Sequence, residues 1–108
     1  MMYKVKFMRL MVMFDLPTGT KKERKAYTLF RKFLIKEGFE MMQFSVYVRI
    51  CRGADMALAY EDRIRRNIPP KGHVRSLVLT NSQYERMHIL LGGPKSQEKI
   101  GAKQLVLF

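Results

Sequence analysis

The chain is poor in cysteine, histidine and acidic residues. Its 108 residues include one cysteine, two histidines, no tryptophan and nine aspartates or glutamates. A single cysteine, Cys51, excludes an internal disulfide and fits a reducing compartment, so we expect a cytoplasmic protein. Neither His73 nor His88 shows metal-ligand spacing or has a cysteine pair nearby, which argues against a zinc site. We interpret Cys51 as a packing residue, because no base lies near it in the sequence.

Long apolar runs are also missing. No stretch reaches the roughly 18 apolar residues that suggest a membrane-spanning helix, and the first residues do not form a cleavable signal pattern. We therefore expect no membrane partner. The length and the hydrophobic content of 47% predict one domain, residues 1–108, with one core.

Acidic residues are outnumbered by basic ones, 9 to 21, so the net charge is +12. This excess predicts a polyanionic partner, nucleic acid first, because neutralising phosphates releases condensed counterions. The basic residues lie on two predicted helices and in the turn after the second one. We expect six of them to contact phosphates, which positions nucleic acid without reading its sequence: Lys21, Lys22, Lys25, Arg63, Arg66 and Lys71.

The segment Phe7–Asp15, FMRLMVMFD, is the clearest predicted strand, and both of its faces are apolar. Because side chains alternate along a strand, one face would carry Met8, Leu10, Val12 and Phe14, and the other Phe7, Met11 and Met13. A strand that is apolar on both sides needs a covering layer on each face of its sheet.

Two amphipathic patterns predict helices. The first helix begins at a capping box formed by Thr20 and Glu23, and Gly38 ends it. The second extends over Asp55–Ile68 and stops at Pro69-Pro70.

Alternating patterns predict the remaining strands. Phe39–Ile50 is longer than a usual strand, so we expect a break near residues 43–45, with Tyr47 on the polar face. A strand over His73–Thr80 follows the second helix. The C-terminal pieces are a capped turn beginning at Thr80, a short strand over His88–Leu91 and an edge strand over Gln104–Phe108.

This order of elements is typical of a ferredoxin-like βαββαβ sandwich, an α+β fold with an accessory C-terminal strand. Its two helices cover only one face of the sheet. The other face would carry Met and Phe side chains of the first strand together with Tyr47, so we expect a homodimer that packs sheet against sheet. The segment of about 92–108 would pair with the sheet edge of the partner.

Asp15 is the candidate for metal chemistry, because it ends an apolar strand and is the only acid before Glu23. Mg²⁺ takes one or two protein carboxylates and completes its shell with water and phosphate oxygens. We therefore expect Asp15 to be a catalytic Mg²⁺ ligand, with Mn²⁺ as the alternative ion. A two-fold axis beside this strand would bring two copies of Asp15 together. The competing interpretation is an Asx-turn ahead of Pro17, which the spacing alone favours.

Two weaker candidates lie near Asp15. The loop Thr18-Gly19-Thr20 could hold a phosphate on the amides of the helix N-terminus, but it lacks the P-loop pattern. Ser45 could contact a phosphate, although a serine on the polar face of a strand is usually structural.

Several motifs strongly resemble the CRISPR-associated protein 2 family: FDLP, QFSVY, the Pro70-Lys71-Gly72 turn and VRSLVLTNSQYERM. The resemblance implies a ferredoxin-like homodimer whose strand-end aspartates, here Asp15, face each other. It also implies metal-dependent endonuclease activity on RNA or DNA, and bridging of dimers of the CRISPR-associated protein 1 integrase during spacer acquisition. The form MMQFSVY is similar to the branch that accompanies large single-effector nucleases.

These two implied activities make different demands. An endonuclease needs Asp15 and its metal, whereas a scaffold for double-stranded protospacer DNA needs the dimer, the basic residues and an edge for the integrase to bind. We rank the scaffold first, because each chain offers one candidate ligand and no general base within the motif. The endonuclease, acting on DNA or single-stranded RNA, is second. A toxin-type or ribosome-associated RNA-binding protein of the same fold is the third alternative.

Overall fold

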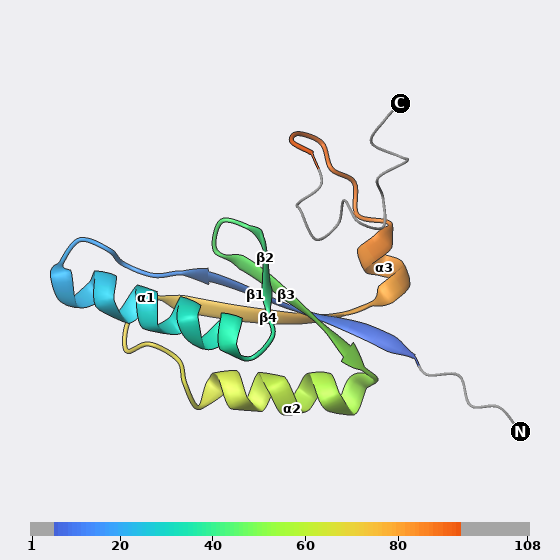
Figure 1. Cartoon of the computed structure of the whole chain (residues 1–108), viewed down its shortest axis with the longest axis horizontal. Helices are drawn as coiled ribbons and strands as arrows, with labels where there is room; N and C mark the ends of the chain where they lie inside the picture. Colours follow the sequence, from blue (N-terminus) through green and yellow to red (C-terminus); the bar gives the residue numbers. More distant parts are fainter. Residues whose placement is uncertain (1–5, 94–108) are drawn as a thin grey trace, which may run out of the picture.

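The computed structural model describes residues 6–93 of the chain. The elements, shown in Figure 1, are β1 (Phe7–Asp15), α1 (Lys21–Lys36), β2 (Glu40–Gln43), β3 (Val46–Arg52), α2 (Ala54–Arg65), β4 (His73–Thr80) and α3 (Asn81–Glu85). The strands form one sheet in the order β2-β3-β1-β4, and every neighbouring pair is antiparallel. The predicted ferredoxin-like fold is therefore confirmed.

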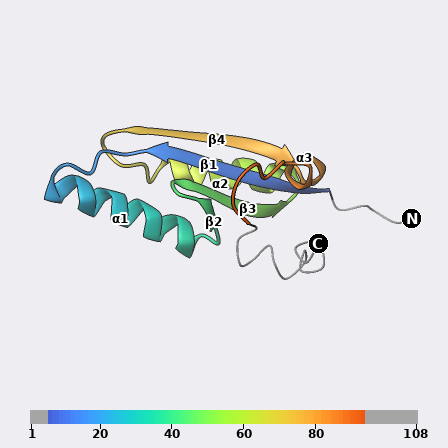
Figure 2. The same ribbon diagram turned by 90° about the horizontal axis from the view of Figure 1, so that it is seen from above.

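The molecule has a helical layer on one face of the sheet. Helices α1 and α2 both lie on that face, whereas α3 lies at one end of the opposite face (Figure 1). Seen from above, β4 and β2 form the two edges of the sheet (Figure 2). Buried side chains fill the space between sheet and helices, chiefly Leu10, Val12, Phe14, Phe30, Leu34, Tyr47, Cys51, Ala57 and Ile64.

Helix α1 begins and ends where the sequence predicts. The Thr20 hydroxyl accepts a hydrogen bond from the Glu23 amide at 3.1 Å, and the Glu23 carboxylate accepts one from the Thr20 amide at 3.0 Å. At the other end, Gly38 has a φ of +89° and follows the last helical turn. Both caps supply partners to terminal backbone groups that the helix itself leaves unpaired.

The long alternating segment divides into β2 and β3, as predicted. The pairing register shifts between Met41 and Gln43, and the turn that follows holds Ser45 at a φ of +63°. The Ser45 carbonyl accepts a hydrogen bond from the Phe14 amide at 3.1 Å. Ser45 is therefore a turn residue that attaches the β2–β3 connection to β1.

Tyr47 lies on the helix side of the sheet, so the expectation that it faces away from the helices is wrong. It pairs with Val12, is 1% exposed and stacks on Phe14 with the ring centroids 5.7 Å apart. Its hydroxyl accepts a hydrogen bond from Arg31 Nε at 2.8 Å. Alternation separates the two faces of a strand, but it does not tell which face the helices cover. A tyrosine suits the covered face when its hydroxyl finds a partner, as here.

Helix α2 ends at Arg65, three residues before the expected Ile68. Proline disfavours a helical backbone at the residue before it, which excludes Ile68 because Pro69 follows. The Asn67 side-chain amide also donates to the Arg63 carbonyl at 2.8 Å and so caps the helix earlier.

The predicted strand over His88–Leu91 is absent from the part of the chain that the structure describes. After α3, which begins at its expected Thr80 cap, residues 88–93 form neither helix nor strand. This stretch is not paired with any of the four strands of the sheet. The expected strand Gln104–Phe108 lies outside the described residues, as does most of the segment 92–108.

The sheet face opposite α1 and α2, here called the open face, is largely apolar. Directly paired residues of antiparallel strands share a face, and the register places on it Phe7, Met11, Met13, Val46, Val48, Ile50, Leu77 and Leu79. Arg9 lies at one end, where Nε donates to Asn81 Oδ1 at 2.9 Å and the guanidinium stacks on Tyr84 of α3. The prediction that β1 is apolar on both faces is confirmed.

None of the helices formed by residues 6–93 has the length and apolar character needed to cross a membrane.

Candidate functional site at the end of strand β1

Asp15 is the last residue of β1, and its side chain is exposed. Its neighbours Phe14 and Leu16 are both buried in the core, so the backbone of Asp15 is held on both sides. Because side chains alternate along a strand, the carboxylate lies on the side of the open face. Among residues 6–93, no donor is hydrogen-bonded to this carboxylate. The Asx-turn that the spacing favoured is therefore not formed, and the carboxylate is free to bind a ligand.

Gly72 allows the start of β4 to lie against the backbone of Asp15. Its φ is +101°, and a Cβ atom added there would lie 2.6 Å from the Asp15 carbonyl oxygen. The same atom would lie 2.8 Å from Leu16 Cδ2. Real Cβ atoms do not approach other atoms this closely, so any other residue at position 72 would displace the turn next to Asp15.

His73, the first residue of β4, is paired with Asp15. Such cross-strand neighbours have Cβ atoms about 4.5–5.5 Å apart and point to the same face. This relationship was not predicted from the sequence, because His73 is far from Asp15 along the chain. The ferredoxin-like order contains a usable signal: β1 and β4 are antiparallel neighbours, so the end of one faces the start of the other.

Four of the six basic residues predicted to contact phosphates come from α1 and from the turn before β4. Lys21, Lys22 and Lys25 lie on the exposed surface of the first turns of α1, and Lys71 lies in the turn before β4. In the described residues, none of these four lysines forms an ion pair. Their charges therefore remain available to phosphates.

The expected contacts on α2 have a different environment. Arg63 forms a salt bridge to Glu37 at 2.7 Å, and Arg66 forms one to Asp62. Asp62 also pairs with Arg65 at 3.3 Å. The hydrogen bond and the charge of Arg66 lower the pKa of the Asp62 carboxyl. The arginines of α2 are thus partly neutralised within the chain, whereas the lysines of α1 are not.

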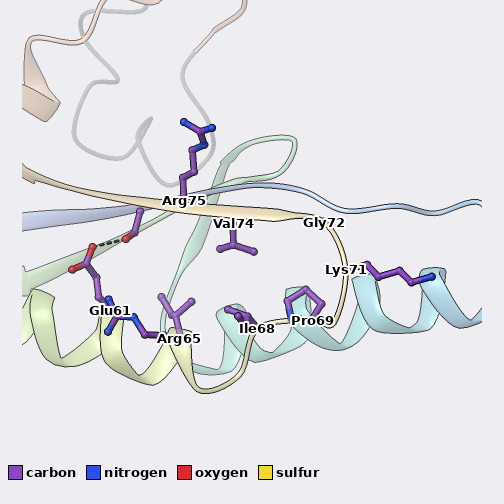
Figure 3. Close-up of a pocket in the computed structure, with 10 residues that line it drawn as sticks. Glu61, Arg65, Ile68, Pro69, Lys71, Gly72, Val74 and Arg75 are labelled. Carbon is purple, nitrogen blue, oxygen red and sulfur yellow. Dashed lines mark hydrogen bonds between the residues drawn. The ribbon is translucent and has the colours of Figure 1, made fainter.

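A cleft of about 230 Å³ lies between the end of α2 and β4 (Figure 3). Glu61 accepts a hydrogen bond from the Ser76 hydroxyl inside it. In Figure 3, Val74 points towards α2 and Arg75 points away from it, which is the alternation expected along β4. The cleft is therefore on the helix side of β4, and His73 and Asp15 are on the other side.

Cys51 is a core residue, as expected. It is buried beneath the helices, and burial raises the pKa of its thiol. A thiol in this state is a poor nucleophile. His88 lies in the exposed stretch after α3.

The end of β1 supplies few protein ligands for a divalent cation. Within residues 6–93 there is no group of three or more His, Cys, Asp or Glu side chains that could hold a metal ion. Asp15 supplies one carboxylate. Mg²⁺ commonly keeps several waters and takes phosphate oxygens from its substrate. An ion at Asp15 would therefore depend on ligands from water or from phosphate.

Comparison with known proteins identifies the family. The family model of CRISPR associated protein Cas2 matches residues 8–87. A Campylobacter jejuni protein named CRISPR-associated endoribonuclease Cas2 is 45% identical over 108 residues, covering 99% of this chain and 76% of that protein. Proteins of the same name from Acidovorax ebreus and Ligilactobacillus salivarius are 47% and 49% identical over 102 and 100 residues. These two matches cover 94% and 93% of this chain, and 100% and 99% of those proteins.

The comparison of structures agrees at the level of the fold. A crystal structure of cas2 superposes with a TM-score of 0.56 at 19% sequence identity, over 83% of this chain and 92% of that chain. The predicted family resemblance is confirmed by the matches in sequence: this chain belongs to the CRISPR-associated protein Cas2 family.

Proposed function

We propose that this chain acts in the cytoplasm as a dimeric scaffold of CRISPR adaptation that binds double-stranded protospacer DNA. The open face is the observation that carries the proposal: Phe7, Ile50 and Leu77 are 43%, 47% and 49% exposed there. Removing apolar surface from water is favourable by about 25 cal/mol per Å². A second copy that packs its own open face against the first would cover both.

The unpaired lysines are the basis for the nucleic-acid partner. Lys21, Lys22, Lys25 and Lys71 have no ion-pair partner within residues 6–93, and a duplex backbone would release counterions on contact with them. Phosphate contacts of this kind position a duplex without reading its sequence. A dimer doubles their number and presents them on both copies.

The expected protein partner is the CRISPR-associated protein 1 integrase, two dimers of which the scaffold would bridge. Family membership favours this adaptation role over a toxin-type or ribosome-associated RNA-binding role. The bridge requires the dimer, so the dimer is the property to test first.

Leu77→Asp tests the interface, and Leu58→Asp is its matched control. Leu58 is 56% exposed but lies on α2, away from the open face. We expect the wild type and Leu58→Asp to have the mass of a dimer in light scattering, and Leu77→Asp to be a monomer with weakened duplex binding and spacer acquisition. A wild-type chain that stays monomeric at high concentration contradicts the proposal.

We propose metal-dependent endonuclease activity as a second function. The relatives described above carry the name endoribonuclease, and the exposed Asp15 carboxylate would hold Mg²⁺ or Mn²⁺. When bound, such an ion supplies positive charge that stabilises charge developing on a phosphodiester. The unpaired lysines would hold the RNA or DNA backbone in place.

Asp15→Asn separates the two functions. We expect the variant to lose cleavage of RNA and DNA while it keeps the dimer, duplex binding and spacer acquisition. If acquisition fails while dimer and duplex binding persist, the chemistry of Asp15 is required for adaptation, and ranking the scaffold first is wrong.

A further inference from the structure

Asp15 and His73 form an exposed cross-strand pair at the corner of the sheet where β1 ends and β4 begins. Both side chains lie on the open-face side, and neither has a hydrogen-bond or ion-pair partner within residues 6–93. We propose that His73 is a second protein ligand of the divalent ion at Asp15, and that it makes the site prefer Mn²⁺ over Mg²⁺. This inference rests on the proposed metal binding by Asp15.

The backbone geometry allows both side chains to reach one ion. Paired residues place their Cβ atoms about 4.5–5.5 Å apart, a separation that a carboxylate and an imidazole can bridge through an ion with ligand distances of about 2.0–2.2 Å. An ion between them would sit above the sheet corner, outside the core.

The neighbours of both residues hold this geometry in place. Phe14 and Leu16, on either side of Asp15, are core residues, and Val74, next to His73, packs against the core. Gly72 lets the β4 backbone approach the Asp15 carbonyl more closely than any side chain would permit. A site whose ligands are fixed by packed neighbours loses little entropy when the ion binds.

The choice of ion follows from the donor set. Mg²⁺ strongly prefers oxygen ligands, whereas an imidazole nitrogen suits first-row transition ions. One carboxylate and one imidazole therefore discriminate between the two ions in a way that a carboxylate alone does not. With two protein ligands, water and phosphate oxygens would fill the remaining positions.

Two positive charges beside His73 indicate that the ion would bind together with a nucleic-acid phosphate. Lys71 and Arg75 lie two residues before and two residues after His73, and their charges oppose binding of a bare cation. A phosphate group would reduce this repulsion and add oxygen ligands. The ion and the nucleic-acid backbone are thus expected to bind more tightly together than separately.

The experiment uses the untagged full chain and MnCl₂ as the probe. The chain has only two histidines, His73 and His88, so a proton NMR spectrum of the His88→Gln variant assigns both imidazole signals. Paramagnetic Mn²⁺ at substoichiometric amounts should broaden the His73 signal and leave that of His88 sharp. Mn²⁺ affinity is then measured by electron paramagnetic resonance, with Mg²⁺ as the competitor.

We expect His73→Gln to lower Mn²⁺ affinity by about tenfold or more, a typical consequence of disturbing a metal site, and to leave Mg²⁺ affinity nearly unchanged. His88→Gln is the matched control and should bind both ions as the wild type does. Thermal unfolding of each variant verifies that the fold is retained.

Two outcomes overturn the inference in distinguishable ways. If Asp15→Asn loses Mn²⁺ binding and His73→Gln does not, His73 is not a ligand, and metal binding by Asp15 stands. If both variants bind Mn²⁺ as the wild type does, the metal binding that underlies the proposed nuclease fails as well.

Discussion

The carbonyl oxygen of Asp15 lies so close to Gly72 that a Cβ atom there would be 2.6 Å from it. This contact joins the end of β1 to the start of β4 and brings His73 beside Asp15. A residue without a side chain is therefore a structural requirement of the candidate site, although it has no chemistry of its own.

Gly72→Ala should destabilise the protein and disturb the site. The left-handed backbone alone costs an L-residue about 1–2 kcal/mol, and the contact with Asp15 adds to that cost. Gly53→Ala is the control, because Gly53 also has a positive φ, +89°, but nothing within 4 Å of an added Cβ. Urea unfolding at one fixed protein concentration should show a larger loss of unfolding free energy for Gly72→Ala than for Gly53→Ala. Equal losses of unfolding free energy would mean that the backbone around Asp15 shifts to make room for the added Cβ at no measurable cost.

Tyr47→Phe should lower the free energy of unfolding by about 0.5–1.5 kcal/mol, because it removes the hydrogen bond from Arg31 Nε. The ring and its packing on Phe14 remain. Tyr27→Phe is a suitable control, because the Tyr27 ring meets Phe14 edge to face and stacks on Phe44, and its hydroxyl has no hydrogen bond to residues 6–93. Denaturant titration of both variants measures the difference, and equal stability of the two would contradict the expected role of the hydroxyl.

Thr20→Ala should destabilise the protein by about 1 kcal/mol, because the Thr20 side chain is the N-cap of α1. Thr28→Ala, on the exposed surface of the same helix, should be neutral or slightly stabilising, since alanine has the higher helix propensity. Thermal or urea unfolding separates the two effects. A Thr20→Ala variant as stable as Thr28→Ala would show that the capping box contributes little.

Lysines of α1 and arginines of α2 should differ in their effect on duplex binding. Each phosphate contact contributes about 0.9 to the slope of log K against log salt for B-form DNA. Replacing Lys21, Lys22 and Lys25 by Gln should therefore weaken binding and flatten this slope. Replacing Arg63 and Arg66 by Gln should change the slope less, because Glu37 and Asp62 already pair with them. Fluorescence anisotropy over a range of salt concentrations measures both slopes.

An unchanged slope in the lysine variant would place the DNA-binding surface elsewhere. A larger change in the arginine variant would show that the salt bridges of α2 open when DNA binds.

Local chemistry was sufficient to predict much of the fold. Thr20, Glu23 and Gly38 specify the limits of α1 because caps depend on hydrogen bonds within a few residues. The apolar run of β1 and the break before β3 also follow from patterns within single segments. The same local view identified Asp15 as the acid at a strand end.

Three features were decided only by tertiary structure. Tyr47 lies under the helices because the packing of whole layers selects which strand face is covered. His73 lies beside Asp15 because strand register depends on how distant segments pair. Arg63 is paired with Glu37, which follows α1 and approaches α2 only in the folded chain.

The sequence by itself thus determined most of the elements, the caps of α1 and the N-cap of α3, the apolar character of both faces of β1 and the family. The tertiary structure decided which side chains share a face and which charges remain unpaired. The physical reason is the distance along the chain over which each interaction acts. Capping and periodicity act over a few residues, whereas strand pairing and the Arg63–Glu37 salt bridge join residues that are far apart in the chain and meet only when the sheet and its helices have assembled.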